Sequence, residues 1–124
     1  MKKSVANGEY LFEEGCFIVE LLNSPSDPQL SVARARVPVG VTTRWHSLEG
    51  IHERYLILEG LGCVEVGDEM SHDVQAGDLI SIPAGCRQRI ANSGGVDLIF
   101  LALCTPRFER RAYHDMEDND RDLS

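Results

Sequence analysis

The chain has 124 residues and a formal net charge of −8, which describes one acidic domain. Such a charge repels a phosphate backbone, so we expect no nucleic acid partner. Hydrophobic residues make up 43% of the chain, but no apolar run approaches the ~20 residues of a membrane-spanning helix, so no membrane partner is expected either. The start, MKKSVANGEYLFEEG, lacks the apolar stretch of a secretion signal. We therefore expect a cytoplasmic protein with four reduced cysteines.

Short strand signals follow one another through the first half of the chain. Residues 10–22 carry strand-forming side chains interrupted by Gly15, and a loop with two prolines follows at 24–28. Residues 30–39 alternate apolar and polar side chains, which is the period of a half-buried strand. Residues 42–48 are again rich in β-branched and aromatic side chains, and they predict another strand.

The second half continues this pattern. Residues 53–60 predict a strand, and residues 62–74 predict a hairpin that turns at Gly67-Asp68. Three strand-like runs follow between turns, at 79–85, 87–92 and 96–104. Nine or ten short strands without a helical period predict an all-β, antiparallel sandwich or closed barrel.

The two ends of the chain differ from its middle. We divide the chain into an N-terminal arm with strands at 1–29, a barrel domain at 30–106, and a C-terminal arm with an acidic tail at 107–124. Residues 107–113 could form one helical turn or an extended arm. From His114 onward, five acidic residues accompany a single arginine, so we expect a solvated, poorly ordered end.

Two sets of residues are spaced in a way that a single turn motif would not produce. The first set, within residues 40–60, is Gly40, His46, Glu53 and Gly60. The second set begins after a gap of sixteen residues (61 to 76) and is Gly77, Pro83, Gly85, Gln88 and Asn92. Together they resemble the two motifs of the cupin superfamily, over roughly residues 30–104. The resemblance implies a small single-domain cupin, whose conserved barrel is a double-stranded β-helix, or jelly roll.

The resemblance also implies a metal site, in a variant form. In cupins, two histidines and a glutamate of the first motif and a histidine of the second bind one divalent metal, often iron, manganese, zinc or nickel. His46 and Glu53 keep two of these positions, whereas Leu48 cannot ligate and Gln88 is a weaker donor than imidazole. Either Gln88 or His52 would complete a set of three, leaving an open position as in catalytic metal sites. His52 would face away from Glu53 in a regular strand, but alternation often breaks where a strand begins.

Substrate-binding residues are predicted from the same strands. Residues i and i+2 share one face of a strand, so Arg44 is expected to line the same cavity as His46. Its guanidinium would bind a substrate carboxylate, or pair with Glu53 instead. Tyr55 could hydrogen-bond the ligand or serve only as a wall, and Gln88 could bind the substrate rather than the metal.

Two functions from different classes are compatible with this pattern. The first is a metal-dependent enzyme, of oxygenase, isomerase or lyase type, acting on a small anionic substrate. The second is a non-catalytic binding or sensing module with a degraded metal site and no metal, which Leu48 and Gln88 favour. Small cupins are commonly homodimers, so the resemblance also implies a homodimer. The fold by itself decides neither function, because one fold hosts many chemistries.

Overall fold

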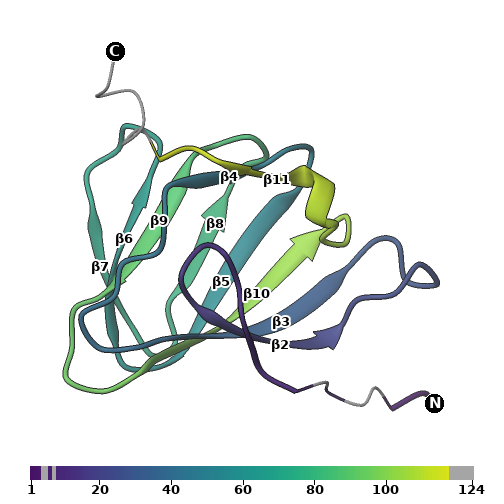
Figure 1. Cartoon of the computed structure of the whole chain (residues 1–124), viewed down its shortest axis with the longest axis horizontal. Helices are drawn as coiled ribbons and strands as arrows, with labels where there is room; N and C mark the ends of the chain where they lie inside the picture. Colours follow the sequence, from purple (N-terminus) through teal and green to yellow (C-terminus); the bar gives the residue numbers. More distant parts are fainter. Residues whose placement is uncertain (4–5, 7, 118–124) are drawn as a thin grey trace.

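The computed structural model describes residues 1–3, 6 and 8–117, and its regular structure is almost entirely β (Figure 1). The first half of the chain forms β1 (Tyr10–Leu11), β2 (Phe17–Leu22), β3 (Ser31–Val37), β4 (His46–Leu48) and β5 (His52–Glu59). The second half forms β6 (Leu61–Val66), β7 (His72–Gln75), β8 (Leu79–Ile82), β9 (Gln88–Asn92), β10 (Leu98–Thr105), the 3₁₀ turn η1 (Arg110–Ala112) and β11 (Tyr113–Asp115). Residues 4, 5 and 7 of the expected N-terminal arm and 118–124 of the expected acidic tail lie outside the described residues.

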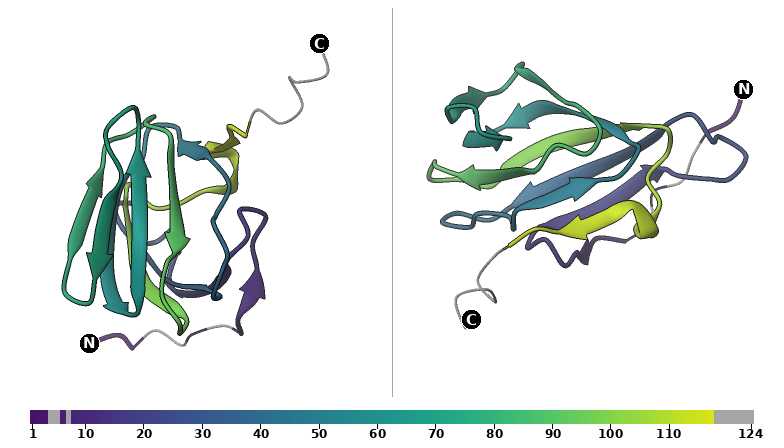
Figure 2. Two further views of the ribbon diagram at one scale, coloured as in Figure 1. Left: turned by 90° about the vertical axis from the view of Figure 1, so that its left-hand side faces the viewer. Right: turned by 90° about the horizontal axis from the view of Figure 1, so that it is seen from above.

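Two antiparallel sheets pack face to face. The larger sheet has the strand order β1-β2-β3-β10-β5-β8, and the smaller has the order β11-β4-β9-β6-β7. Figure 2 shows the sheets as two layers that curve around a common interior. This arrangement confirms the expected all-β jelly roll, including the hairpin of β6 and β7. No helix in the described part of the chain has both the length and the apolar character that a membrane span requires.

Alternation along β5 sets which side chains enter the interior. Glu53, Tyr55 and Ile57 are buried, whereas the residues between them are only half-buried. This is the period of two that a strand imposes when one face packs on the opposite sheet. Ile57 joins a core cluster that includes Ile82, both about 1% exposed. Glu53 and Tyr55 therefore point into the interior, although one of them is acidic.

The end of the chain contains a strand that the sequence did not predict. In β11, Tyr113 pairs with Leu48 of β4, and Asp115 pairs with His46. The Tyr113 side chain is buried against the interior. The side chains of His114 and Asp115 are exposed, as expected, but the expectation of a poorly ordered end was wrong for these two residues, because they pair with β4 beside the buried tyrosine.

Candidate active site

A cavity of about 60 Å³ lies between the two sheets. Its wall is built from the β1–β2 hairpin, β3, β5 and β10 on one side and from β4 and β11 on the other. Such a volume accommodates roughly four water molecules or a small organic molecule. Most of the wall is apolar, and its ionisable side chains are Tyr10, Glu14, Cys16, Glu20, His46, Glu53, Tyr55, Cys104 and Tyr113.

His46 is the first residue of β4 and is 2% exposed. Its Nδ1 atom lies 2.7 Å from the carbonyl oxygen of Arg44, and because a carbonyl only accepts, Nδ1–H is the donor. This bond fixes the tautomer and leaves Nε2 with a free lone pair, 3.5 Å from Oε2 of Glu14. The ring also stacks on Tyr113, with 5.2 Å between centroids. Burial lowers the pKa of His46, which favours the neutral ring.

Glu14 comes from the loop between β1 and β2, and sequence reasoning did not single it out. Gly15, at φ +102°, allows the loop to turn tightly, and its N–H donates to the carbonyl of Phe12 at 2.9 Å. The carbonyl of Glu14 accepts from the backbone N–H of Arg44 at 2.8 Å, which ties the loop to the residues before β4. These bonds bring the Glu14 carboxyl to His46, and burial raises the pKa of Glu14 to about 7.

Glu53 enters the same cavity from β5 and is 8% exposed. Its Oε2 accepts a weak hydrogen bond from the thiol of Cys104 at 3.7 Å. Its Oε1 is buried and has no hydrogen-bond partner among the described residues. Burial first, and the charge of Glu14 second, raise the pKa of Glu53 to about 7, although His46 acts in the opposite direction.

Tyr55 and Gln88 form a buried hydrogen-bonded pair. The Tyr55 hydroxyl donates to Oε1 of Gln88 at 2.5 Å, and Gln88 is 1% exposed. The tyrosine ring lines the cavity and packs on Phe100 at 4.4 Å between centroids, whereas Gln88 does not line the cavity. The oxygen through which Gln88 could bind a metal or a substrate is thus engaged with the Tyr55 hydroxyl.

Two of the predicted site residues lie away from the cavity. Arg44 precedes β4, and its guanidinium pairs with the half-exposed Asp115 at 3.0 Å instead of lining the interior. Arg44 was expected to share the face of His46, but β4 begins only at His46, so Arg44 does not have the regular geometry of that strand. His52 begins β5 on the face opposite Glu53, and it does not line the cavity.

Only part of the predicted metal-ligand set comes together in the cavity. His46 and Glu53 line one cavity, as expected, but Leu48 is apolar, Gln88 is engaged, and His52 lies on the other face of β5. Across residues 1–3, 6 and 8–117, no three His, Cys, Asp or Glu side chains are grouped so that they could hold a metal ion. The arrangement of two carboxyls around one imidazole is suited instead to proton transfer.

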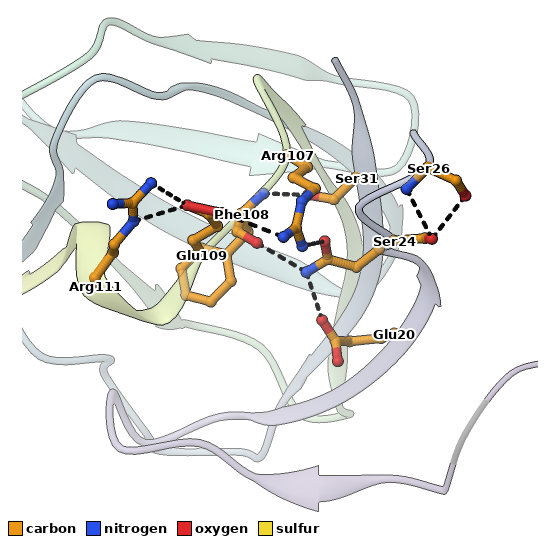
Figure 3. Close-up of polar contacts among 9 residues, drawn as sticks. Glu20, Ser24, Ser26, Ser31, Arg107, Phe108, Glu109 and Arg111 are labelled. Atoms are coloured by element: carbon orange, nitrogen blue, oxygen red, sulfur yellow. Dashed lines mark hydrogen bonds and ion pairs between the residues drawn. The ribbon is translucent and has the colours of Figure 1, made fainter. Parts of the chain in front are cut away.

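A polar network ties the segment before β11 to Ser31 of β3 and to Asn23, which follows β2 (Figure 3). The backbone N–H of Phe108 donates to the Ser31 hydroxyl at 2.8 Å, and its carbonyl accepts from the Asn23 amide at 2.9 Å. Arg107 donates to Oδ1 of Asn23 at 2.9 Å and also bonds Glu109. The network places the Phe108 ring in the cavity wall, where it packs edge-on against an aromatic ring of the β1–β2 hairpin.

The family model of the Cupin domain matches residues 33–104, which include β4, β5, β9 and all but the last residue of β10. This chain belongs to the cupin family. An uncharacterized protein of Methanocaldococcus jannaschii is 37% identical to this cupin over 101 residues, covering 80% of each chain.

Solved structures with the same fold include proteins with named activities. A predicted oxalate decarboxylase from Thermotoga maritima is 26% identical, with a TM-score of 0.71 over 83% of this cupin and 93% of that chain. The Streptomyces nucleoside dehydratase Pac13 is 17% identical, with a TM-score of 0.76 over 94% of this cupin and 92% of that chain. An oxalate decarboxylase from Lactobacillus farciminis is 21% identical, also with a TM-score of 0.76. That match covers 94% of this cupin but only 35% of the decarboxylase chain.

Proposed function

We propose that this cupin is an enzyme of isomerase or lyase type that acts on a small molecule by general acid–base catalysis. The observation that carries the proposal is the meeting of Glu14, His46 and Glu53 in the wall of one cavity. Both carboxyls have a pKa raised to about 7, so each can give or take a proton at neutral pH. The structural relatives include a decarboxylase and a dehydratase by name, which agrees with lyase chemistry on this fold.

The three side chains have different roles in this proposal. Nε2 of His46 has a fixed lone pair and acts as the base that removes a substrate proton. Glu14, 3.5 Å from that atom, takes up or returns the proton at the rim formed by the hairpin loop. Glu53 binds a substrate N–H or O–H through its open Oε1 and keeps the reacting carbon close to His46. The apolar wall, including Leu48, limits access of water to the reacting groups.

Solvent exchange on a panel of candidate substrates tests this function. Small carbonyl compounds and hydroxy compounds are incubated with the enzyme in D₂O, and deuterium incorporation or elimination is followed by NMR. We expect at least one compound to react, and His46→Asn and Glu53→Gln to slow it about 100-fold or more. The matched control is His72→Asn, an exposed histidine on β7, which should leave the rate unchanged. Unchanged rates in both cavity variants would contradict the proposal.

Metal dependence, which the cupin motifs imply, is tested most simply by elemental analysis. Because no three His, Cys, Asp or Glu side chains of the described residues are grouped closely enough to hold a metal ion, we expect untagged protein purified without chelator to contain far less than one equivalent of iron, manganese, zinc or nickel. About one metal per chain that disappears in His46→Ala would instead support a metal-dependent oxygenase, isomerase or lyase.

A non-catalytic binding or sensing module is the second candidate. It is favoured by the small cavity and by Leu48, which replaces a polar side chain in the wall. Saturable ligand binding without exchange or turnover for any bound compound would support it. The homodimer and the cytoplasmic location stay predictions, and size-exclusion chromatography with light scattering tests the homodimer.

A further inference from the structure

The charges of the cavity wall are all of one sign. Glu14, Glu20 and Glu53 line it, whereas none of its lining residues within the described chain is lysine or arginine. Arg44, the cation expected to hold an anionic substrate, is paired with Asp115 outside the cavity. An anion entering this space would meet two or three carboxyls in a low-dielectric environment without a compensating charge.

The cavity has two buried groups without a hydrogen-bond partner among the described residues, a carboxyl oxygen of Glu53, which accepts, and the Tyr113 hydroxyl, which can accept or donate. Oε1 of Glu53 is buried, on a side chain that is 8% exposed, and no group among the described residues meets the geometry of a hydrogen bond to it, although the nearby Gln88 side chain acts to lower the pKa of Glu53. A buried carboxyl oxygen without a donor is costly, and such atoms are rare in folded proteins. Oε2 of Glu14 lies 3.5 Å from the ring nitrogen of His46, which is too long for a strong hydrogen bond, and the Cys16 thiol beside this carboxyl is a weak donor. Both carboxyls can therefore accept from a stronger donor that a ligand provides.

Aromatic rings supply a second part of the wall, beside aliphatic side chains. Phe12 lies edge-on to both Tyr113 and Phe108, with centroids 5.1 and 6.0 Å apart, and all three rings line the cavity. Ring faces attract cations, and they also pack well on short alkyl groups. An occupant that suits these surroundings has several N–H donors, a positive charge and a small apolar body.

We infer that the cavity takes a small protonated primary amine, whose ammonium group lies between the carboxyls of Glu14 and Glu53. An ammonium carries three donors, enough for both carboxyls at once, and its charge balances the acidic wall. The cavity of about 60 Å³ limits the ligand to a few heavy atoms. The inference rests on the proposed function, because it names the substrate class of the same site, and it replaces the anionic substrate expected from the sequence.

Three probes of similar size test this inference on the wild-type protein: propylammonium, 1-propanol and propionate. Each is titrated at constant ionic strength and followed by the NMR shifts of the cavity residues. We expect propylammonium to bind at least about tenfold more tightly than 1-propanol, and propionate not to bind measurably. Propionate binding as well as or better than propylammonium would overturn the inference.

Charge-removing variants locate the binding group. Glu53→Gln and Glu14→Gln keep the side-chain shape, and each should weaken propylammonium binding about tenfold while leaving 1-propanol unchanged. The control is Glu65→Gln, which removes a carboxyl that pairs with Arg89 outside the cavity and should change neither affinity. Unchanged propylammonium binding in both cavity variants would contradict the inference.

The outcomes separate this inference from the proposed function. Selective amine binding without exchange or turnover of any amine would support the inference and contradict acid–base catalysis. Turnover of uncharged compounds that depends on His46, in a protein that does not bind propylammonium, would overturn the inference and support the proposed function.

Discussion

The two ends of β5 serve different purposes, although they belong to one strand and face the same interior. At Ile57 the interior is a packed apolar core, and the side chain is 1% exposed. Four residues earlier, Glu53 is almost as deeply buried but keeps an oxygen without a donor among the described residues, in a cavity shared with Glu14 and His46. Packing of the apolar end stabilises the barrel, and this stabilisation offsets the free-energy cost of burying carboxyls at the other end.

Leu98→Ala tests the packed end and should have the largest effect on stability. Leu98 is 0% exposed and belongs to the core cluster, so truncation removes buried surface and leaves a cavity. We expect the free energy of unfolding to fall by about 3–4 kcal/mol in urea denaturation. Ser93→Ala, at an exposed loop position, is the control and should change it by less than about 0.5 kcal/mol. A loss below about 1 kcal/mol in Leu98→Ala would show that this end is not tightly packed.

The pH dependence of stability tests the acidic end. The pKa of Glu53 is near its ordinary value of 4.5 in the unfolded chain and about 7 in the folded chain. The pKa of Glu14 rises by the same amount on folding. Between these values the folded chain binds more protons than the unfolded chain, so the free energy of unfolding falls as pH rises from about 4.5 to about 7. We expect the two carboxyls together to contribute a loss on the order of 5 kcal/mol between pH 5 and pH 8. His46, whose pKa is lowered, contributes a smaller opposite slope.

The Glu53→Gln variant isolates the carboxyl contribution to that slope. Without the ionisable group, the variant should be more stable than the wild type at pH 8 and close to it at pH 5. Glu65→Gln, on a half-buried surface carboxyl, should follow the wild-type curve. If the free energy of unfolding of Glu53→Gln kept the full pH dependence of the wild type, burial of the Glu53 carboxyl would not be its cause.

A smaller effect is expected at the network that holds the C-terminal segment. Ser31→Ala removes the acceptor of the Phe108 backbone N–H and should cost about 1 kcal/mol in urea denaturation. It should also weaken propylammonium binding slightly, because the Phe108 ring is part of the wall. Ser24→Ala, whose hydroxyl contacts its own exposed loop, is the matched control and should change neither quantity. Equal effects of the two substitutions would argue against a role for the network in shaping the cavity.

Much of the barrel could be predicted from the sequence because its signals are local. Alternation and turn residues marked the strands, and the spacing from His46 to Glu53 indicated correctly that both enter one cavity. Arg44 was misplaced because spacing does not reveal where a strand begins, and β4 starts two residues later.

The missed features depend on contacts between distant segments. Glu14 reaches His46 across 32 residues of sequence (46 minus 14), through a loop whose only local signal is Gly15 between two strand-like runs. The strand at Tyr113 is polar after its first residue, so its ordering depends on pairing with the edge of β4 rather than on its own sequence. Such long-range pairings leave no period in the sequence, and the tertiary structure is needed to see them.

The most direct measurement is a ¹³C NMR titration of the glutamate side-chain carboxyls, with Glu14→Gln and Glu53→Gln used to assign the two signals. If Glu14 and Glu53 share one buried cavity with His46, both carboxyls titrate with midpoints of about 7. Midpoints near the ordinary value of 4.5 for both would place these groups in contact with bulk water and contradict the account.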